Sequence, residues 1–301
     1  MKNNLLSELQ IRQLLCDGAM GTQLLAAGLA SGECSVAWNI DRPDIVRDVH
    51  HAYVLAGCSL VTTNTFSGTT SVLAGHGLAE RMAELNRAGA QLARAAAGDS
   101  AWVLGDVGPF GDFLKPLGEM TPAELRCIFR AQIEALIEGG ADAILAETMC
   151  DPAEVEVGIT AAKDVGPIPV VASYTFQKAG PTEFRTMMGT TVEEAMKRAI
   201  NAGADIVGTN CGTALTLADY VELARQLVAA AGQTPVIVQP NAGAPQVIDG
   251  QTVYLATPDE MGAVVPQLLK AGVRIVGGCC GTSPAILTAM SSVLRREIVG
   301  G

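Results

Sequence analysis

A short apolar run recurs eight times along this chain, and that repetition constrains the fold more than any other feature. Each run ends in Gly, Asn, Thr or an acidic residue, and a longer segment with a helical pattern follows it. Short runs that are apolar throughout are typical of parallel strands buried on both faces of a sheet. The sequence therefore predicts eight strands, at Leu14–Gly18, Ser59–Asn64, Trp102–Asp106, Ala143–Glu147, Val170–Tyr174, Ile206–Asn210, Val236–Pro240 and Ile275–Cys279.

The segments between these runs carry the signals of helix ends. Thr121 and Thr257 each precede a proline, with a glutamate three residues after the threonine, which is the pattern of a capping box. Thr191, which precedes Val192 and two glutamates, also predicts a helix start. Glycines follow the helical segments shortly before the next strand, as in a left-handed C-terminal cap, at Gly57, Gly140, Gly203 and Gly272.

Eight alternating strand and helix units in 301 residues predict an α/β fold. We expect a (β/α)8 TIM barrel that forms a single domain over residues 1–301. A doubly wound open sheet is the alternative, although it would usually have fewer units. In a barrel the active site lies at the C-terminal ends of the strands. The polar and small residues of this chain gather at those ends, which indicates an enzyme.

The composition excludes several classes of protein. The formal net charge is −11, so the chain would repel nucleic acid and anionic membrane surfaces, and we expect neither as a partner. It is 49% hydrophobic and has 33 glycines, which suits a covered core with tight turns rather than disorder. The N-terminal segment lacks the apolar core of a signal peptide and no run is long enough to cross a bilayer, so a cytoplasmic protein is expected.

Three of the eight cysteines lie at predicted strand ends beside glycines. Cys211 follows the sixth strand, and Cys279 and Cys280 end the eighth within a Gly-Gly-Cys-Cys-Gly-Thr run. Alternate strands of a barrel send side chains into the same interior layers, so the three thiols are expected to meet. Because neighbouring residues of a strand point to opposite faces, the chain must bend at these glycines for both cysteines to face one ion. Thiolates favour Zn²⁺, and three of them would leave one ligand position open, as in a catalytic site.

The alternative is that the three thiols are small buried apolar groups, since free cysteine is among the most buried residue types. A disulfide between Cys279 and Cys280 is a further alternative, but it would be strained. The remaining cysteines lack the same glycine-rich setting, and we expect all of them to be non-ligands: Cys16, Cys34, Cys58, Cys127 and Cys150.

A metal ion with three thiolate ligands suits some reactions better than others. Hydrolytic zinc sites use histidine or carboxylate ligands, and His50, His51 and His76 all lie away from the strand ends, which disfavours a zinc hydrolase. Coordination of a substrate thiol would instead give a thiolate at neutral pH. The inferred reaction is alkyl transfer to a thiol. The alternative from another class is a non-catalytic barrel that binds zinc or senses thiols.

Polar groups at the other strand ends are candidates for substrate binding. Asp17 and Glu147 could hold the ammonium group of an amino-acid thiol; alternatively, Asp17 caps the following helix and Glu147 pairs with a structural base. A glycine-rich turn could donate backbone N–H groups to a substrate carboxylate, through Gly18, Ala19, Met20, Gly21 and Thr22. Three asparagines are either substrate contacts or turn residues: Asn64, Asn210 and Asn241.

One segment is similar to the start of a cobalamin-ligating motif, Asp48-Val49-His50. Tyr53 stands where that motif has a glycine, and the segment has a helical pattern. We interpret it as a solvated or packing face of a helix and not as a cofactor site.

Taken together, the strand-end motifs resemble the homocysteine S-methyltransferase family over nearly the whole chain, and in detail the homocysteine-binding barrel of cobalamin-dependent methionine synthase. The segments that carry the resemblance are Asp17–Thr22, Thr63–Phe66, Glu147-Thr148, Gly208–Cys211, Pro240–Gly243 and Gly277–Thr282. The resemblance implies a zinc ion held by Cys211, Cys279 and Cys280, with the sulfur of homocysteine as an exchangeable ligand. It also implies that Asp17 and Glu147 hold the amino group of homocysteine, with the backbone of residues 19–22 near its carboxylate.

The resemblance implies methionine as the product and leaves the methyl donor open. We expect no pterin-binding, cobalamin-binding or activation module in a chain of this length. The expected donor is a methylated corrinoid, methylcobalamin carried by a separate protein or module. The alternative keeps homocysteine as the acceptor and uses S-methylmethionine or S-adenosylmethionine as the donor.

Overall fold

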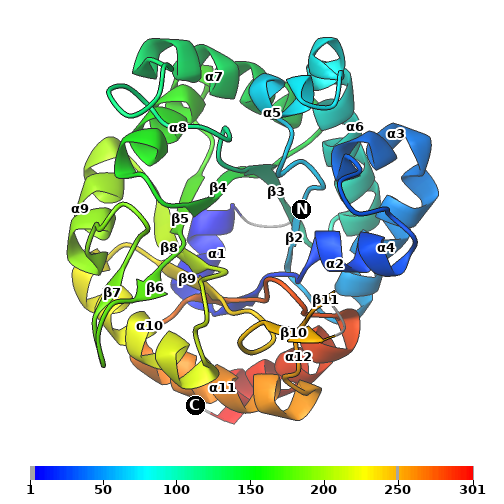
Figure 1. Cartoon of the computed structure of the whole chain (residues 1–301). Coiled ribbons are helices and arrows are strands. Elements are labelled where there is room, and N and C mark those ends of the chain that lie inside the picture. The colour runs from blue at the N-terminus through cyan, green and yellow to red at the C-terminus, as the bar shows by residue number, and fades with distance from the viewer. Residues whose placement is uncertain (1–3, 249–250, 301) are drawn as a thin grey trace.

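The computed structural model describes residues 4–248 and 251–300, and its centre is a ring of parallel strands (Figure 1). A parallel bridge between Cys16 and Leu60 joins the first and last strands of the sheet and closes the ring. The prediction of a (β/α)8 barrel is confirmed, and the doubly wound open sheet is wrong. Within the described ranges, eight strands pair in the order β1 (Leu14–Leu15), β12 (Ile275–Val276), β9 (Val236–Gln239), β8 (Ile206–Asn210), β5 (Val170–Tyr174), β4 (Ala143–Met149), β3 (Trp102–Val107) and β2 (Leu60–Thr62).

All eight strands lie at the predicted apolar runs, but four of them are shorter than predicted, namely β1, β2, β9 and β12. β1 and β12 pair over two residues each, and the chain then leaves the regular ladder. It stays tied to its neighbours, because the Gly278 N–H donates to the Asp17 carbonyl (2.9 Å) and the Cys279 N–H donates to the Pro240 carbonyl (2.8 Å). The strand ends are therefore irregular where the predicted site begins.

Helices surround the barrel, as Figure 1 shows. They pack as a closed ring in the order α4 (Pro43–Leu55), α6 (Met82–Ala97), α7 (Pro122–Glu138), α8 (Pro152–Val165), α9 (Val192–Ala202), α10 (Leu217–Ala231), α11 (Pro258–Ala271) and α12 (Pro284–Gly300), which returns to α4. Shorter helices lie in the connections, namely α2 (Met20–Ala26), α3 (Trp38–Asp41) and α5 (Thr70–Ala74).

The predicted helix ends are confirmed. Thr121 and Thr257 form capping boxes with Glu124 and Glu260, and the Thr191 side chain accepts a hydrogen bond from the Glu194 N–H. The four predicted C-terminal glycines have φ angles between 97° and 105°, a left-handed conformation that glycine adopts without a Cβ clash: Gly57, Gly140, Gly203 and Gly272.

The N-terminal helix α1 (Leu5–Ile11) closes the end of the barrel opposite the strand C-termini. Leu5 and Leu9 are buried in one cluster with interior residues of the strands, among them Leu60, Val171 and Ile237. In Figure 1 this helix lies behind the ring of strands, at its centre. The barrel interior is thus packed and plugged at one end, which leaves the other end for a site.

Two small antiparallel pairs follow barrel strands and were not predicted. β6 (Gln177–Lys178) pairs with β7 (Phe184–Arg185) in the connection after β5. β10 (Gln246–Ile248) pairs with β11 (Gln251–Val253) in the connection after β9. Across the described residues, no helix is long and apolar enough to cross a membrane.

Candidate functional site

A cavity of about 260 Å³ opens at the C-terminal ends of the barrel strands. It brings together side chains and backbone from the connections after most of the strands. Its lining residues are Asp17, Gly18, Ala19, Met20, Gly21, Thr22, Ser35, Thr62, Thr63, Asn64, Thr65, Phe66, Asp106, Glu147, Thr148, Cys211, Gln239, Gly278, Cys279 and Cys280.

Three thiols meet at one side of this cavity. The sulfur atoms of Cys211, Cys279 and Cys280 all lie within 4.8 Å of one another, and those of Cys211 and Cys280 are 3.9 Å apart. They form the one group of three or more candidate metal ligands found among the described residues. All three cysteines are free thiols, so the disulfide alternative is not what the structure shows.

The backbone reaches this arrangement through two left-handed turns. Cys211 itself has a φ of 56°, a conformation that is uncommon for a residue with a side chain. After Cys280, Gly281 has a φ of 78°, and a Cβ there would lie 2.3 Å from the Tyr254 side chain. The predicted bend is therefore present, and it follows the cysteines at Gly281.

Each thiol changes the acidity of the others. Hydrogen bonds with Cys279 and Cys280 lower the pKa of Cys211, whereas hydrogen bonding with Cys211 raises the pKa of Cys279 well above its ordinary value. The cluster thus favours one thiolate stabilised by two thiols. A bound metal cation would lower the pKa of all three thiols and would favour their thiolate forms.

Asp17 and Glu147 both line the cavity. In the structure Asp17 does not cap the following helix, and Glu147 does not pair with a basic side chain among the described residues. Helix α2 begins after Ala19 without a side-chain cap, so Asp17 does not cap it. The Asp17 carboxylate instead accepts hydrogen bonds from the Thr62 N–H (2.7 Å) and hydroxyl (2.9 Å), which ties β1 to β2. Glu147 accepts a bond from the Asn210 amide (3.3 Å), and no ion pair involves it among the described residues.

Both carboxyl groups are harder to ionise than usual. Burial raises the pKa of Asp17 to about 7. Burial, reinforced by the charges of Asp17 and Cys211, raises the pKa of Glu147 to about 8. Acidic groups held close together in a poorly hydrated site favour a cation, because its charge compensates theirs.

Asn210 holds two residues of the cavity, Glu147 and Thr148, in place through hydrogen bonds. Its side-chain oxygen accepts from the Thr148 N–H (2.9 Å) and the Ser173 hydroxyl (2.7 Å), and its amide nitrogen donates to the Thr148 hydroxyl (2.7 Å). Thr148 has a φ of 58°, which is strained for a β-branched residue. Asn210 is fully buried, so it fixes Thr148 and Glu147, and its own side chain does not line the cavity.

The other two candidate asparagines differ from each other. Asn64 lines the cavity, but its amide donates to the Ser35 carbonyl (2.8 Å) and to Asn39 (3.0 Å). Asn241 is buried outside the lining and donates to the Gly212 carbonyl (3.3 Å), next to Cys211.

The glycine-rich turn lies against the cavity, as predicted, and leads into α2. The first four N–H groups of a helix have no partner inside it, and the side chain of the N-cap residue usually satisfies one of them. Ala19 has no such side chain, whereas α7, α9, α10 and α11 all begin on a capping threonine. The Ala19 N–H donates to the Thr282 hydroxyl (3.0 Å). Gly18 is required here, because a Cβ would lie 2.5 Å from the Thr282 hydroxyl. Met20, Gly21 and Thr22, the first residues of α2, line the cavity, and the helix start has no side-chain cap.

Several polar residues of the cavity were not among the predicted site residues, and two of them are Asp106 on β3 and Gln239 on β9. Each is 3% exposed and carries a buried oxygen without a hydrogen-bond partner in the part of the chain that the structure describes. The signal was present in the sequence, since each is a polar residue at or next to the C-terminal end of an apolar strand.

A family model described as "Homocysteine S-methyltransferase" matches residues 14–294, which is nearly the whole barrel. The chain belongs to the homocysteine S-methyltransferase family. This confirms the resemblance drawn from the strand-end motifs.

Relatives of the family agree with this assignment. The chain is 33% identical to methionine synthase of Mycobacterium tuberculosis over 98% of its length, and 31% identical to that of Mycobacterium leprae over 97%. It spans about a quarter of the length of these two proteins, at 26% and 25%. The metallated form of the homocysteine methyltransferase MmuM from Escherichia coli matches with a TM-score of 0.80 and 25% identity, over 96% of this chain and 99% of that one.

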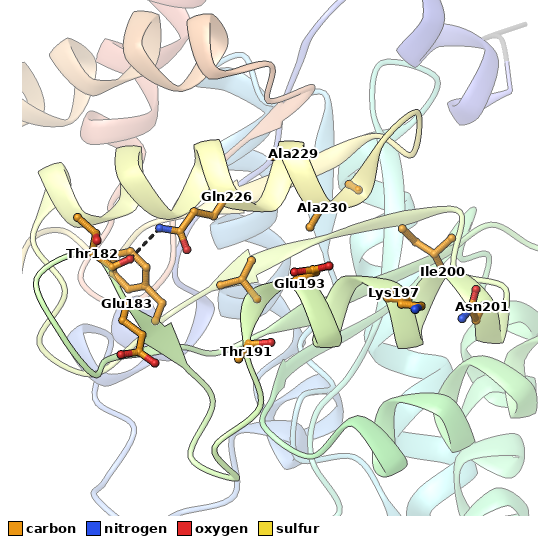
Figure 2. Close-up of a pocket in the computed structure, with 13 residues that line it drawn as sticks. Thr182, Glu183, Thr191, Glu193, Lys197, Ile200, Asn201, Gln226, Ala229 and Ala230 are labelled. Atoms are coloured by element: carbon orange, nitrogen blue, oxygen red, sulfur yellow. Dashed lines mark hydrogen bonds between the residues drawn. The ribbon is translucent and has the colours of Figure 1, made fainter.

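A larger hollow, of about 800 Å³, lies outside the barrel between α9 and α10 (Figure 2). Figure 2 shows Glu193 and Lys197 on α9 and Gln226 on α10, where Gln226 donates a hydrogen bond to the Thr182 carbonyl (2.8 Å). This hollow contains none of the strand-end groups of the family, so the smaller cavity at the strand ends is the candidate active site.

The remaining five cysteines lie outside the thiol cluster, in keeping with the expectation that they are not ligands. Cys127 is exposed on α7 and Cys150 is half-buried after β4, while the others are buried: Cys16, Cys34 and Cys58.

Proposed function

We propose that this protein transfers a methyl group to the thiol of homocysteine, giving methionine, with a zinc ion held by Cys211, Cys279 and Cys280. The observation that carries the proposal is that three thiols, a carboxyl group for an ammonium and free amides for a carboxylate all line one cavity. These groups complement the three functional groups of homocysteine, which are its thiol, its ammonium group and its carboxylate. Membership of the family supports the same acceptor.

The thiol cluster fits zinc. Two sulfurs bound at about 2.3 Å to a tetrahedral zinc would lie about 3.8 Å apart. The observed separation between Cys211 and Cys280 is 3.9 Å, so these two thiols need little movement. When bound there, zinc would lower the pKa of a substrate thiol at its remaining position and present it as a thiolate.

The rest of the site would hold the amino-acid part of the substrate. The ammonium group would donate to Glu147 and Asp17, whose raised pKa values fall when a cation sits beside them. The substrate carboxylate would accept from the N–H groups at the start of α2, where the helix dipole also favours an anion. These contacts would fix the sulfur beside the three cysteines, which lowers the entropic cost of bringing it to the methyl carbon.

The chemical step forms one bond and breaks one. The substrate sulfur attacks the methyl carbon with its electron pair, and the donor leaves with the pair of the bond that breaks. The thiol proton would pass to solvent as the thiolate forms, before attack, so no side chain has to remove a proton in the transition state. Asp17 and Glu147 are accordingly binding groups in this proposal.

The metal can be tested by removing one ligand. Cys211→Ala should abolish stoichiometric zinc binding, measured by metal analysis after dialysis, and methionine formation with it. Cys127→Ala is the matched control, because Cys127 is an exposed cysteine on α7 and should keep both properties. Full turnover by metal-free protein would contradict the proposal.

For the donor, we propose a methylated corrinoid carried by a separate protein or module. The similarity to methionine synthases supports this, and so does their greater length, which has room for a donor-carrying part. His50 of the Asp48-Val49-His50 segment is fully buried in α4, so this imidazole is not available to a corrinoid. Phe66, which lines the cavity, is an exposed apolar side chain that suits contact with a bulky donor carrier. Further exposed apolar side chains lie on connections that follow other barrel strands: Leu117, Met187, Val247 and Leu255.

A small donor is the second candidate, and a specific observation favours it. MmuM is described as a homocysteine methyltransferase, and the match covers 99% of the MmuM chain. That chain is therefore about as long as this barrel and has little room for a donor-carrying module. The two kinds of donor are compared by measuring methionine formation with methylcobalamin, S-methylmethionine and S-adenosylmethionine. The corrinoid proposal requires the highest rate with methylcobalamin, and a higher rate with either sulfonium compound would overturn it.

A non-catalytic zinc or thiol barrel is less well supported. A structural zinc site has four protein ligands, and the cluster offers three among the described residues. Absence of homocysteine binding by calorimetry with zinc-loaded protein would favour that alternative. The free state of all eight cysteines supports a reducing, cytoplasmic location.

A further inference from the structure

Asp106 is a carboxyl group held rigidly in the cavity without a donor. Its backbone N–H donates to the Thr63 hydroxyl (2.9 Å), and its carbonyl accepts from the Thr65 hydroxyl (2.8 Å) and the Gln132 amide (3.4 Å). The side chain lines the cavity and is 3% exposed. Its Oδ1 atom has no hydrogen-bond partner among the described residues.

An acceptor buried in this way costs free energy unless something donates to it. No Lys or Arg within the described ranges forms an ion pair with Asp106. Burial raises the pKa of Asp106, and the charges of its acidic neighbours Glu147 and Asp17 raise it further. A neutral or anionic ligand would leave this imbalance in place, whereas a cation with N–H donors would correct it.

The three carboxyl groups are not equivalent as acceptors. Both oxygens of Asp17 already accept from Thr62, and Glu147 accepts one bond, from Asn210. Asp106 has the least satisfied carboxyl group of the three. An ammonium group carries three N–H donors, which is one for each of these acids.

We propose that Asp106 is a further substrate-binding residue, which accepts an N–H bond from the substrate's ammonium group and makes the site selective for thiols that carry an α-amino group. This inference rests on the proposed function and adds a residue to it. With Asp106 in place, a thiol acid without an amino group would enter a cavity of carboxyl groups with no compensating charge. The site would therefore reject such a thiol even though its sulfur and carboxylate match those of homocysteine.

The test compares two ligands and three proteins. Calorimetry with zinc-loaded protein gives the dissociation constants of homocysteine and of 4-mercaptobutanoate, which is homocysteine without its amino group. Asp106→Asn should weaken homocysteine binding by about 10- to 100-fold, the usual effect of losing a charged hydrogen-bond partner. It should leave 4-mercaptobutanoate binding unchanged or stronger. Asp112→Asn, which removes one charge from an exposed position in the same connection, is the matched control and should change neither.

Each outcome decides the inference. Unchanged homocysteine binding by Asp106→Asn, or equal weakening of both ligands, would overturn it, since the second result describes a structural residue. Asp106→Ser is a second variant with a smaller neutral side chain, and it should show the same selective loss if the amide variant folds poorly. Wild-type protein that binds no homocysteine would instead overturn the proposed function itself, so the two failures are distinguishable.

Discussion

Glu154 shows at the scale of one residue how burial changes stability with pH. It lies 3% exposed in the first turn of α8 and accepts a hydrogen bond from the Phe110 N–H (2.8 Å). Burial raises its pKa to about 7. The folded protein therefore holds a proton that the unfolded chain loses above about pH 4.5, and this stabilising contribution is lost as pH rises through 7.

Glu154→Gln removes that titration and keeps an acceptor for Phe110. At pH 8 the variant should be more stable than wild type by about 2–3 kcal/mol, and at pH 4 the two should be equal. Urea unfolding at a series of pH values measures the difference. Glu119→Gln, at an exposed site, serves as the control and should follow wild type throughout. A variant whose stability falls with pH as steeply as wild type would contradict the assignment to Glu154.

The sequence could identify some site residues and not others, for a physical reason. Cysteines beside glycines at strand ends are few and chemically distinctive, so Cys211, Cys279 and Cys280 were predicted together. Asp106 and Gln239 lie at or next to the ends of apolar runs, but whether such a residue faces the barrel interior or the helices depends on strand register, which a short run does not specify. Asp17 was ambiguous for a similar reason, since an acid before a helix is as typical of a cap as of a site.

Helix α2 offers a prediction at the scale of one element. It begins on Ala19 without a capping side chain, and the proposed function assigns its free N–H groups to a substrate carboxylate. Ala19→Asp would supply a cap, which usually stabilises a protein by about 0.5–2 kcal/mol. The same carboxylate would occupy the substrate's position and repel it, so homocysteine affinity should fall by more than about tenfold.

Thr191→Ala is the converse control for that experiment. It removes the cap of α9, which is remote from the cavity lining, and so should lower stability without changing homocysteine binding. Thermal unfolding and calorimetry on both variants measure the two effects separately. If Ala19→Asp binds homocysteine as tightly as wild type, the start of α2 is not the carboxylate site.

Elements differed in how well the sequence predicted them. The barrel strands were found because burial on both faces makes each of them a mostly apolar run, and the helices because threonine caps and C-terminal glycines mark their ends. The pairs β6–β7 and β10–β11 have strands of two or three residues. Such strands contain too few side chains to establish a period of two, so only the tertiary context reveals them.

The closed barrel makes one site from segments far apart in the chain. Cys211 and Cys280 are separated by 69 residues, and they meet because β8 and β12 both pair with β9. The ring is uneven, however, since β1 and β12 pair over two residues, whereas β3 and β4 pair over four. The proposed metal ligands after β12 thus lie beside the least extensively paired part of the ring.

Hydrogen exchange of the whole molecule should report this unevenness. In metal-free protein, amides of residues 14–17 and 275–279 should exchange faster than those of residues 102–107 and 143–149, because short ladders open at lower free-energy cost. Zinc should slow exchange in residues 275–282, since it would bind the thiols of Cys279 and Cys280 to that of Cys211 on a different strand connection. In Cys211→Ala the metal-free pattern should persist and the zinc effect should be absent. Equal exchange across all four segments would contradict this prediction and show that the two-residue strands are as stable as their longer neighbours. The hydrogen bonds beyond these strands, from Gly278 to Asp17 and from Cys279 to Pro240, would then complete the ladder.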